Sequence, residues 1–144
     1  MLIGQYESKL TSKNQVSFPK KFRSYLGNKL IITKGIDSNL IVVSQKQYKT
    51  LLEGTEGLPF LDLDARELQR FILGNASVVE LDAKGRFVLP SFLREFAHLQ
   101  EDVIFAGVER FVEVWDKEEW DAHQIEISKR VITISQRLTE KNAK

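Results

Sequence analysis

The chain has 144 residues and a formal net charge of +1, with 42% hydrophobic and 28% charged residues. This length suits one ordinary domain or two very small ones, and the composition is that of a globular protein with a real core. The absence of cysteine excludes disulfides and thiolate chemistry. No run of residues resembles a signal peptide or a membrane span. We therefore expect a cytoplasmic protein.

The first elements in chain order are a turn, a strand and a helix start within LTSKNQVSFP, residues 10–19. Val16 and Phe18 alternate with polar neighbours, as in a half-buried strand. Pro19 suits the first turn of a helix, where its missing N–H costs nothing. Gly27 is a plausible C-terminal cap of that helix. Its predicted apolar face consists of Phe22, Tyr25 and Leu26.

The middle of the chain predicts a loop followed by an amphipathic helix. Residues 54–59, GTEGLP, are rich in glycine and proline and indicate a loop. Asp62 or Asp64 can cap a helix that runs through Leu73. Its apolar face, formed by Leu68, Phe71 and Ile72, predicts packing against the rest of the molecule.

The second half of the chain repeats the first at an offset of 71 residues. LDAKGRFVLP, residues 81–90, matches residues 10–19, and residues 102–120 match residues 29–48 with a one-residue slip. Units of roughly 45 residues have difficulty making their own core, so we expect the two copies to pack together as a pseudo-dimer. The closing helix of each copy starts with a capping-box pattern, Ser44 with Gln47 and Asp116 with Glu119.

The last segment, residues 121–140, is compatible with a helix, and its apolar residues are only loosely periodic. His98 and His123 have no neighbouring ligand pattern, and no metal-ligand spacing, phosphate-binding glycine loop or nucleophile motif is present. We therefore expect no enzyme activity, no cofactor, no metal and no small-molecule substrate.

Charge is distributed unevenly between the copies. Residues 8–36 hold seven Lys and Arg and no Asp or Glu, a formal charge of +7, whereas residues 79–107 sum to −2. A basic face within a near-neutral chain is typical of a surface that meets a polyanion, although a solvated face without a partner is the alternative. We predict DNA contacts because Lys and Arg hold phosphates, while Asn and Gln pair with adenine edges. The candidate residues are Lys13, Asn14, Gln15, Lys20, Lys21 and Arg23.

Over essentially residues 1–120 the sequence resembles the MraZ family of the SpoVT-AbrB superfamily. The segments that carry the resemblance are residues 10–19, LDAKGRFVLPSFLREFA, DARELQRFILGNASVVELD and EVWDKEEW. The resemblance implies a mainly β fold with short helices (α+β), in which two swapped-hairpin, β-barrel-like repeats form an intramolecular pseudo-dimer with linker and C-terminal helices. The expected units are repeat 1 (5–47), the linker (48–75), repeat 2 (76–119) and a helical tail (120–144).

The resemblance also implies a function. Members of the family bind direct repeats of double-stranded DNA in the promoter of the division and cell-wall gene cluster and regulate its transcription. They form ring-like homo-oligomers, often octamers, and are cytoplasmic and nucleoid-associated. We therefore predict a sequence-specific DNA-binding regulator. The alternative is a ring-forming structural or protein-interaction module without specific DNA readout.

The family motif D-x-x-G-R is complete only in the second copy of this chain. Asp82, Lys84, Gly85 and Arg86 form that copy, which could serve structure or DNA, and we favour an Asp82–Arg86 ion pair that fixes the hairpin. The first copy departs at Thr11, Asn14 and Gln15. Asn tolerates the left-handed conformation that Gly supplies. Gln15, however, replaces a guanidinium with a neutral amide, which removes a guanine or phosphate contact and could favour adenine.

Overall fold

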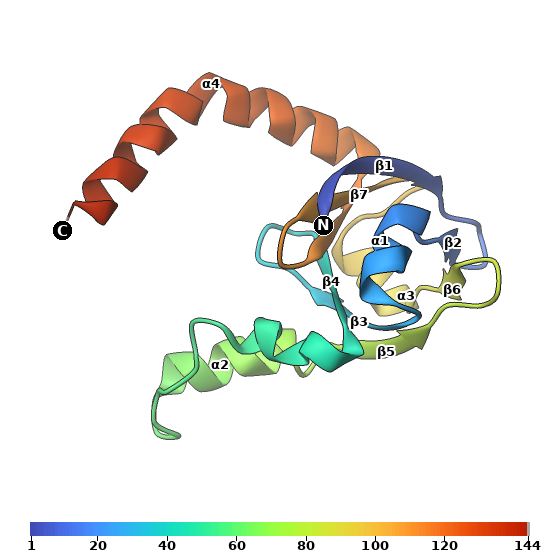
Figure 1. Cartoon of the computed structure of the whole chain (residues 1–144), viewed down its shortest axis with the longest axis horizontal. Helices are drawn as coiled ribbons and strands as arrows, with labels where there is room; N and C mark the ends of the chain where they lie inside the picture. Colours follow the sequence, from blue (N-terminus) through green and yellow to red (C-terminus); the bar gives the residue numbers. More distant parts are fainter. Residues whose placement is uncertain (144) are drawn as a thin grey trace.

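The structure, a computed structural model, describes residues 1–143. Each repeat contributes four strands and one short helix, and two further helical segments and a long C-terminal helix complete the chain (Figure 1). In order the elements are β1 (Ile3–Lys9), β2 (Gln15–Ser17), α1 (Lys20–Leu26), β3 (Lys29–Lys34), β4 (Leu40–Ser44), the 3-10 helix η1 (Gln45–Leu52), α2 (Leu63–Ile72), β5 (Ser77–Glu80), β6 (Arg86–Val88), α3 (Ser91–Phe96), β7 (Asp102–Val108), β8 (Val112–Asp116) and α4 (Lys117–Asn142).

The two repeats exchange strands. The main sheet is antiparallel with the order β1-β7-β8-β4-β3-β5, so the first strand of each repeat pairs with the third strand of the other. β4 pairs with β8 in the centre, and β2 pairs with β6 in a separate two-stranded ladder. The expected pseudo-dimer of two repeats is therefore confirmed. Among residues 1–143 the ladder of the main sheet ends at β1 and β5, so strand pairing does not close a barrel.

One hydrophobic core is shared by both repeats. Phe22, from α1, and Phe105, from β7, are both fully buried, and Phe18 packs edge-on against Phe105 with ring centroids 5.4 Å apart. The equivalent helix of repeat 2 buries Leu93 completely. Because each repeat supplies part of one continuous cluster, neither repeat encloses a core of its own.

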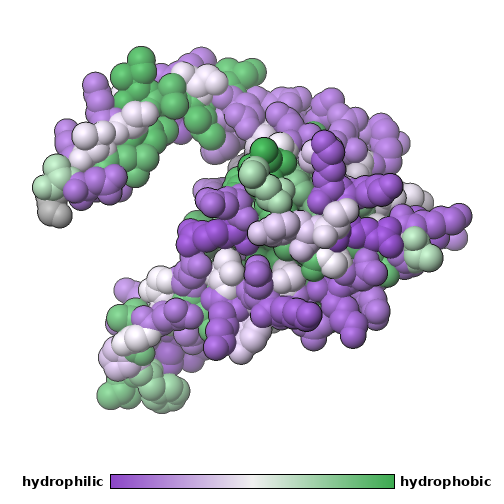
Figure 2. All heavy atoms as spheres, in the orientation of Figure 1, coloured by the Kyte–Doolittle hydropathy of each residue, from purple (hydrophilic) through white to green (hydrophobic). Residues whose placement is uncertain are grey.

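α2 packs its predicted apolar face, Leu68, Phe71 and Ile72, against the body, whereas most of α4 projects from it, away from the β2–β6 ladder (Figure 1). α4 is anchored only near its start, where Trp120 is buried against Trp115 and donates a hydrogen bond to Gln5 (2.8 Å). We call the loop before α2 together with α2, residues 53–72, the α2 arm. Hydrophobic residues appear along α4 and at the tip of the α2 arm, whereas most of the visible body surface is hydrophilic (Figure 2). Within the described part of the chain, no helix combines the length and apolar content needed to cross a membrane.

Local predictions met different outcomes. The cap at Asp62 is confirmed, because its carboxylate accepts a hydrogen bond from the Ala65 N–H (3.0 Å). The capping box at Asp116 is wrong: its carboxylate instead accepts the backbone N–H of Gln100 (3.0 Å), and no side chain caps α4. The predicted apolar face of α1 is wrong at Tyr25, which is 59% exposed.

Candidate nucleic-acid interface

The turns that precede β2 and β6 share one backbone scaffold. In repeat 2, Oδ1 of Asp82 accepts the backbone N–H groups of Lys84 and Arg86, both at 2.9 Å. In repeat 1, Oγ1 of Thr11 accepts the equivalent N–H groups of Lys13 (3.3 Å) and Gln15 (3.0 Å). A hydroxyl therefore replaces the carboxylate as the acceptor that shapes the turn.

The fourth residue of each turn has a left-handed backbone. Gly85 has φ +79° in repeat 2, and Asn14 has φ +64° at the same place in repeat 1. This conformation is costly for most residues but tolerated by Asn, as the sequence predicts. The turn of repeat 1 thus has the backbone conformation of the repeat 2 turn, although Asn14 stands where repeat 2 has glycine.

The two turns differ in what their fifth residue does. Arg86 donates from Nε to Oδ2 of Asp82 at 2.9 Å, which confirms the predicted ion pair. The backbone and side-chain hydrogen bonds from Arg86 lower the pKa of the Asp82 carboxyl below its ordinary value. Thr11 offers no carboxylate to Gln15, and within residues 1–143 no hydrogen bond engages the Gln15 side chain. The amide of Gln15 is therefore available to a ligand.

Each turn rests against the helix of the other repeat. Arg94 of α3 donates from Nη1 to the Thr11 carbonyl and to Oδ1 of Asn14, both at 2.8 Å. Arg23 of α1 points to the other turn and donates to the Ala83 carbonyl at 3.4 Å. The exchange of strands places these partners together, although they are far apart in sequence.

The candidate residues consequently fall into two groups rather than one. Lys13, Asn14 and Gln15 lie beside α3, whereas Lys20, Lys21 and Arg23 lie on α1, which adjoins the turn that carries Lys84. The β2–β6 ladder between the groups has three residue pairs, or about 10 Å of strand. The two groups can therefore belong to one surface. We call turns 11–15 and 82–86 with helices α1 and α3 the paired-turn surface.

The exposed lysines of this surface are unpaired. Among the described residues no ion pair involves the four exposed lysines, whereas Lys9 nearby is paired with Asp102. Lys20 and Lys21 occupy the first turn of α1, which holds no acidic residue, and positive charge there opposes the helix dipole. Lys21 lies with Nζ 6.0 Å from the centroid of the Tyr6 ring, and no ion pair among residues 1–143 engages the other three, which leaves these charges available for an anionic partner. The four exposed lysines are Lys13, Lys20, Lys21 and Lys84.

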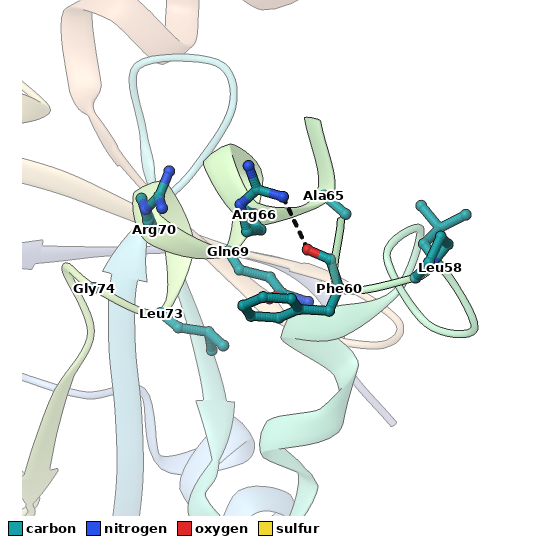
Figure 3. Close-up of a pocket in the computed structure, with 9 residues that line it drawn as sticks. Leu58, Phe60, Ala65, Arg66, Gln69, Arg70, Leu73 and Gly74 are labelled. Atoms are coloured by element: carbon teal, nitrogen blue, oxygen red, sulfur yellow. Dashed lines mark hydrogen bonds between the residues drawn. The ribbon is translucent and has the colours of Figure 1, made fainter. Parts of the chain in front are cut away.

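A second surface feature lies on the α2 arm. A groove of about 560 Å³ beside α2 is lined by Leu58, Phe60 and Leu73 together with Arg66, which donates to the Phe60 carbonyl at 2.8 Å (Figure 3). Phe60 is 83% exposed at its edge. The apolar lining suits an apolar side chain of another molecule better than a phosphate group.

Sequence comparisons agree with the duplicated architecture. The sequence model of the family described as "MraZ protein, putative antitoxin-like" matches this chain twice, over residues 1–71 and 72–142. A transcriptional regulator MraZ of Caldanaerobacter subterraneus subsp. tengcongensis is 46% identical over 123 residues, which cover 85% of this chain and 86% of the relative. Another of the same name, from Thermoanaerobacter pseudethanolicus, is 39% identical over 142 residues, 99% of each chain.

Proposed function

Because the chain belongs to the MraZ family, we propose that it is a transcriptional regulator that binds DNA through the paired-turn surface. In this proposal it acts in the cytoplasm on the nucleoid, where it recognises direct repeats in the promoter of the division and cell-wall gene cluster. Its relatives are named as transcriptional regulators, which supports the regulatory role.

The observation that carries the DNA assignment is the free polar surface of repeat 1. The side-chain amide of Gln15 has no hydrogen-bond partner within residues 1–143, and Lys13 beside it and Lys20 and Lys21 on α1 are exposed and without an ion pair. An amide of this kind can pair with an adenine edge, and the lysines can hold the flanking phosphates. Arg86, the residue at the same place in repeat 2, is already engaged by Asp82. We therefore assign base reading to repeat 1 and phosphate contacts to both repeats.

The experiment compares binding of the chain to its own upstream region and to a random duplex of equal length at the same salt. We expect Lys20→Glu with Lys21→Glu to abolish binding to the upstream region while the oligomer persists. Unchanged binding would refute the assignment of the basic surface. An affinity ratio near one for the unaltered chain would favour an interaction module without specific readout.

We further propose a ring-like homo-oligomer, an octamer in the form that the family resemblance implies. α4 carries a stripe at heptad spacing, Ile127, Val131, Ile134 and Leu138, and most of the helix is not packed against the body. A helix without packing is marginal in water, so the stripe calls for a partner. A ring needs two different patches on each chain. In our proposal the stripe of one copy therefore packs into the α2 groove of the next copy.

Native mass spectrometry tests this assembly. We expect Ile134→Asp in the stripe and Phe60→Asp in the groove each to reduce the oligomer to smaller species. Ile132→Asp is the matched control, because Ile132 is 73% exposed and lies outside the stripe, about a third of a turn around α4. Loss of the ring in the control, or its persistence in both test variants, would refute the proposed contact.

A further inference from the structure

Arg94 of α3 holds the DNA-reading turn of the other repeat at several points. Its Nη1 donates to the Thr11 carbonyl and to Oδ1 of Asn14, both at 2.8 Å. Its Nε donates to the Leu99 carbonyl at 3.1 Å, which holds the guanidinium against its own repeat. A half-buried guanidinium with three such bonds is a rigid fork rather than a mobile surface charge.

Asn14 completes this contact. Besides accepting from Arg94, its Nδ2 donates to Oγ of Ser91 at 3.0 Å, and its carbonyl accepts the Leu89 N–H at 2.7 Å. All three partners belong to repeat 2. The residue that replaces the family's glycine therefore ties the turn of repeat 1 to the helix of repeat 2.

The turn of repeat 2 is tied less extensively, although the Gly85 carbonyl likewise accepts the Phe18 N–H at 2.8 Å. Arg23, the counterpart of Arg94, reaches only the Ala83 carbonyl at 3.4 Å and otherwise donates to Asn28 (3.0 Å). Gly85, at the place of Asn14, has no side chain to accept, and a Cβ there would lie 2.9 Å from Nη1 of Arg23. Repeat 2 fixes its turn internally, through the Asp82–Arg86 ion pair. Repeat 1 lacks that pair, so its turn depends on Arg94 of repeat 2 in addition to its internal hydrogen bonds to the Thr11 hydroxyl.

We propose that Arg94 and Asn14 form an inter-repeat clamp that presents Gln15 to DNA, with Arg94 as a positioning residue for base reading. This inference rests on the proposed DNA-binding function and deepens it. A turn held before binding loses less conformational freedom on binding, and its amide keeps one direction relative to a base edge. Loosening the clamp should therefore reduce discrimination between sequences more than it reduces phosphate binding.

The test measures, for the full chain, the ratio of affinities for its own upstream duplex and for a scrambled duplex at the same salt. We expect Arg94→Gln to lower this ratio about tenfold, the scale of one charged hydrogen bond. Arg94→Lys should lower it nearly as far, because lysine keeps the charge but not the fork. Asn14→Gly, which keeps the turn and removes its side chain, should act in the same direction. Arg130→Gln on α4 is the control of equal charge and should leave the ratio unchanged.

A second measurement examines the clamp without DNA. Amide hydrogen exchange in the turn around Gln15 should become about tenfold faster in Arg94→Gln, again the scale of one charged hydrogen bond, and stay unchanged in Arg130→Gln. If Arg94→Lys or Arg94→Gln has the same affinity ratio as the wild type, the clamp is refuted and the proposed function stays intact. A wild-type ratio near one would overturn specific reading by this surface, and with it the role of the clamp.

Discussion

The salt dependence of DNA binding offers a quantitative test of the paired-turn surface. Four exposed, unpaired lysines surround the two turns, and each phosphate that a lysine neutralises contributes about 0.9 to the slope of log K against log salt. Four contacts give a slope of about −3.6, which is an affinity loss of about 150-fold when salt rises from about 50 to about 200 mM. Lys20→Ala with Lys21→Ala should reduce the slope to about −1.8 and the loss to about 12-fold.

Fluorescence anisotropy with a labelled duplex short enough for one chain measures these slopes. The control is Lys129→Ala with Lys141→Ala, two exposed lysines on α4, which projects away from the paired-turn surface (Figure 1). The control should keep the wild-type slope. An equal change of slope in both double variants, or none in the first, would show that the lysines of α1 do not contact phosphates.

Three further predictions concern the fold. Phe22→Ala should lower the free energy of unfolding in urea by about 3–5 kcal/mol, because Phe22 is fully buried; a loss below about 1 kcal/mol would contradict the shared core. Gly85→Ala should destabilise more than Gly57→Ala in thermal melts, since both have positive φ but only Gly85 lies against Arg23. Asp82→Asn should lower the melting temperature at neutral pH and less at acidic pH. The folded-state pKa of Asp82 is lowered, so its contribution is present above the ordinary carboxyl pKa and is lost as pH falls through the folded value; a pH-independent difference would refute this.

Local patterns in the sequence predicted much of this architecture. The turn before each short strand, the left-handed Asn14, the Asp62 cap and the Asp82–Arg86 pair all depend on residues close together in the chain. Short-range hydrogen bonding determines such features, so spacing alone reveals them.

Features that depend on distant residues could not be predicted from local patterns. Asp116 fits a capping box, but its carboxylate accepts a hydrogen bond from the backbone N–H of Gln100, which the fold brings close. Tyr25 has helical spacing on an apolar face, yet the core ends before it and leaves it exposed. The division of the candidate site into two groups follows from strand exchange, which no spacing within one repeat encodes.

Strand exchange also determines when the protein can fold during its synthesis. β1 leaves the ribosome first, but β7, its only sheet partner within residues 1–143, is among the last strands to be made. Throughout that interval β1 is an unpaired edge, and its alternating polar residues, Gln5, Glu7 and Lys9, discourage pairing with other nascent chains. A chain that stops before β7 lacks both β7, the partner of β1, and β8, which pairs with β4 in the centre of the sheet. Truncated products should therefore remain unfolded and open to proteolysis.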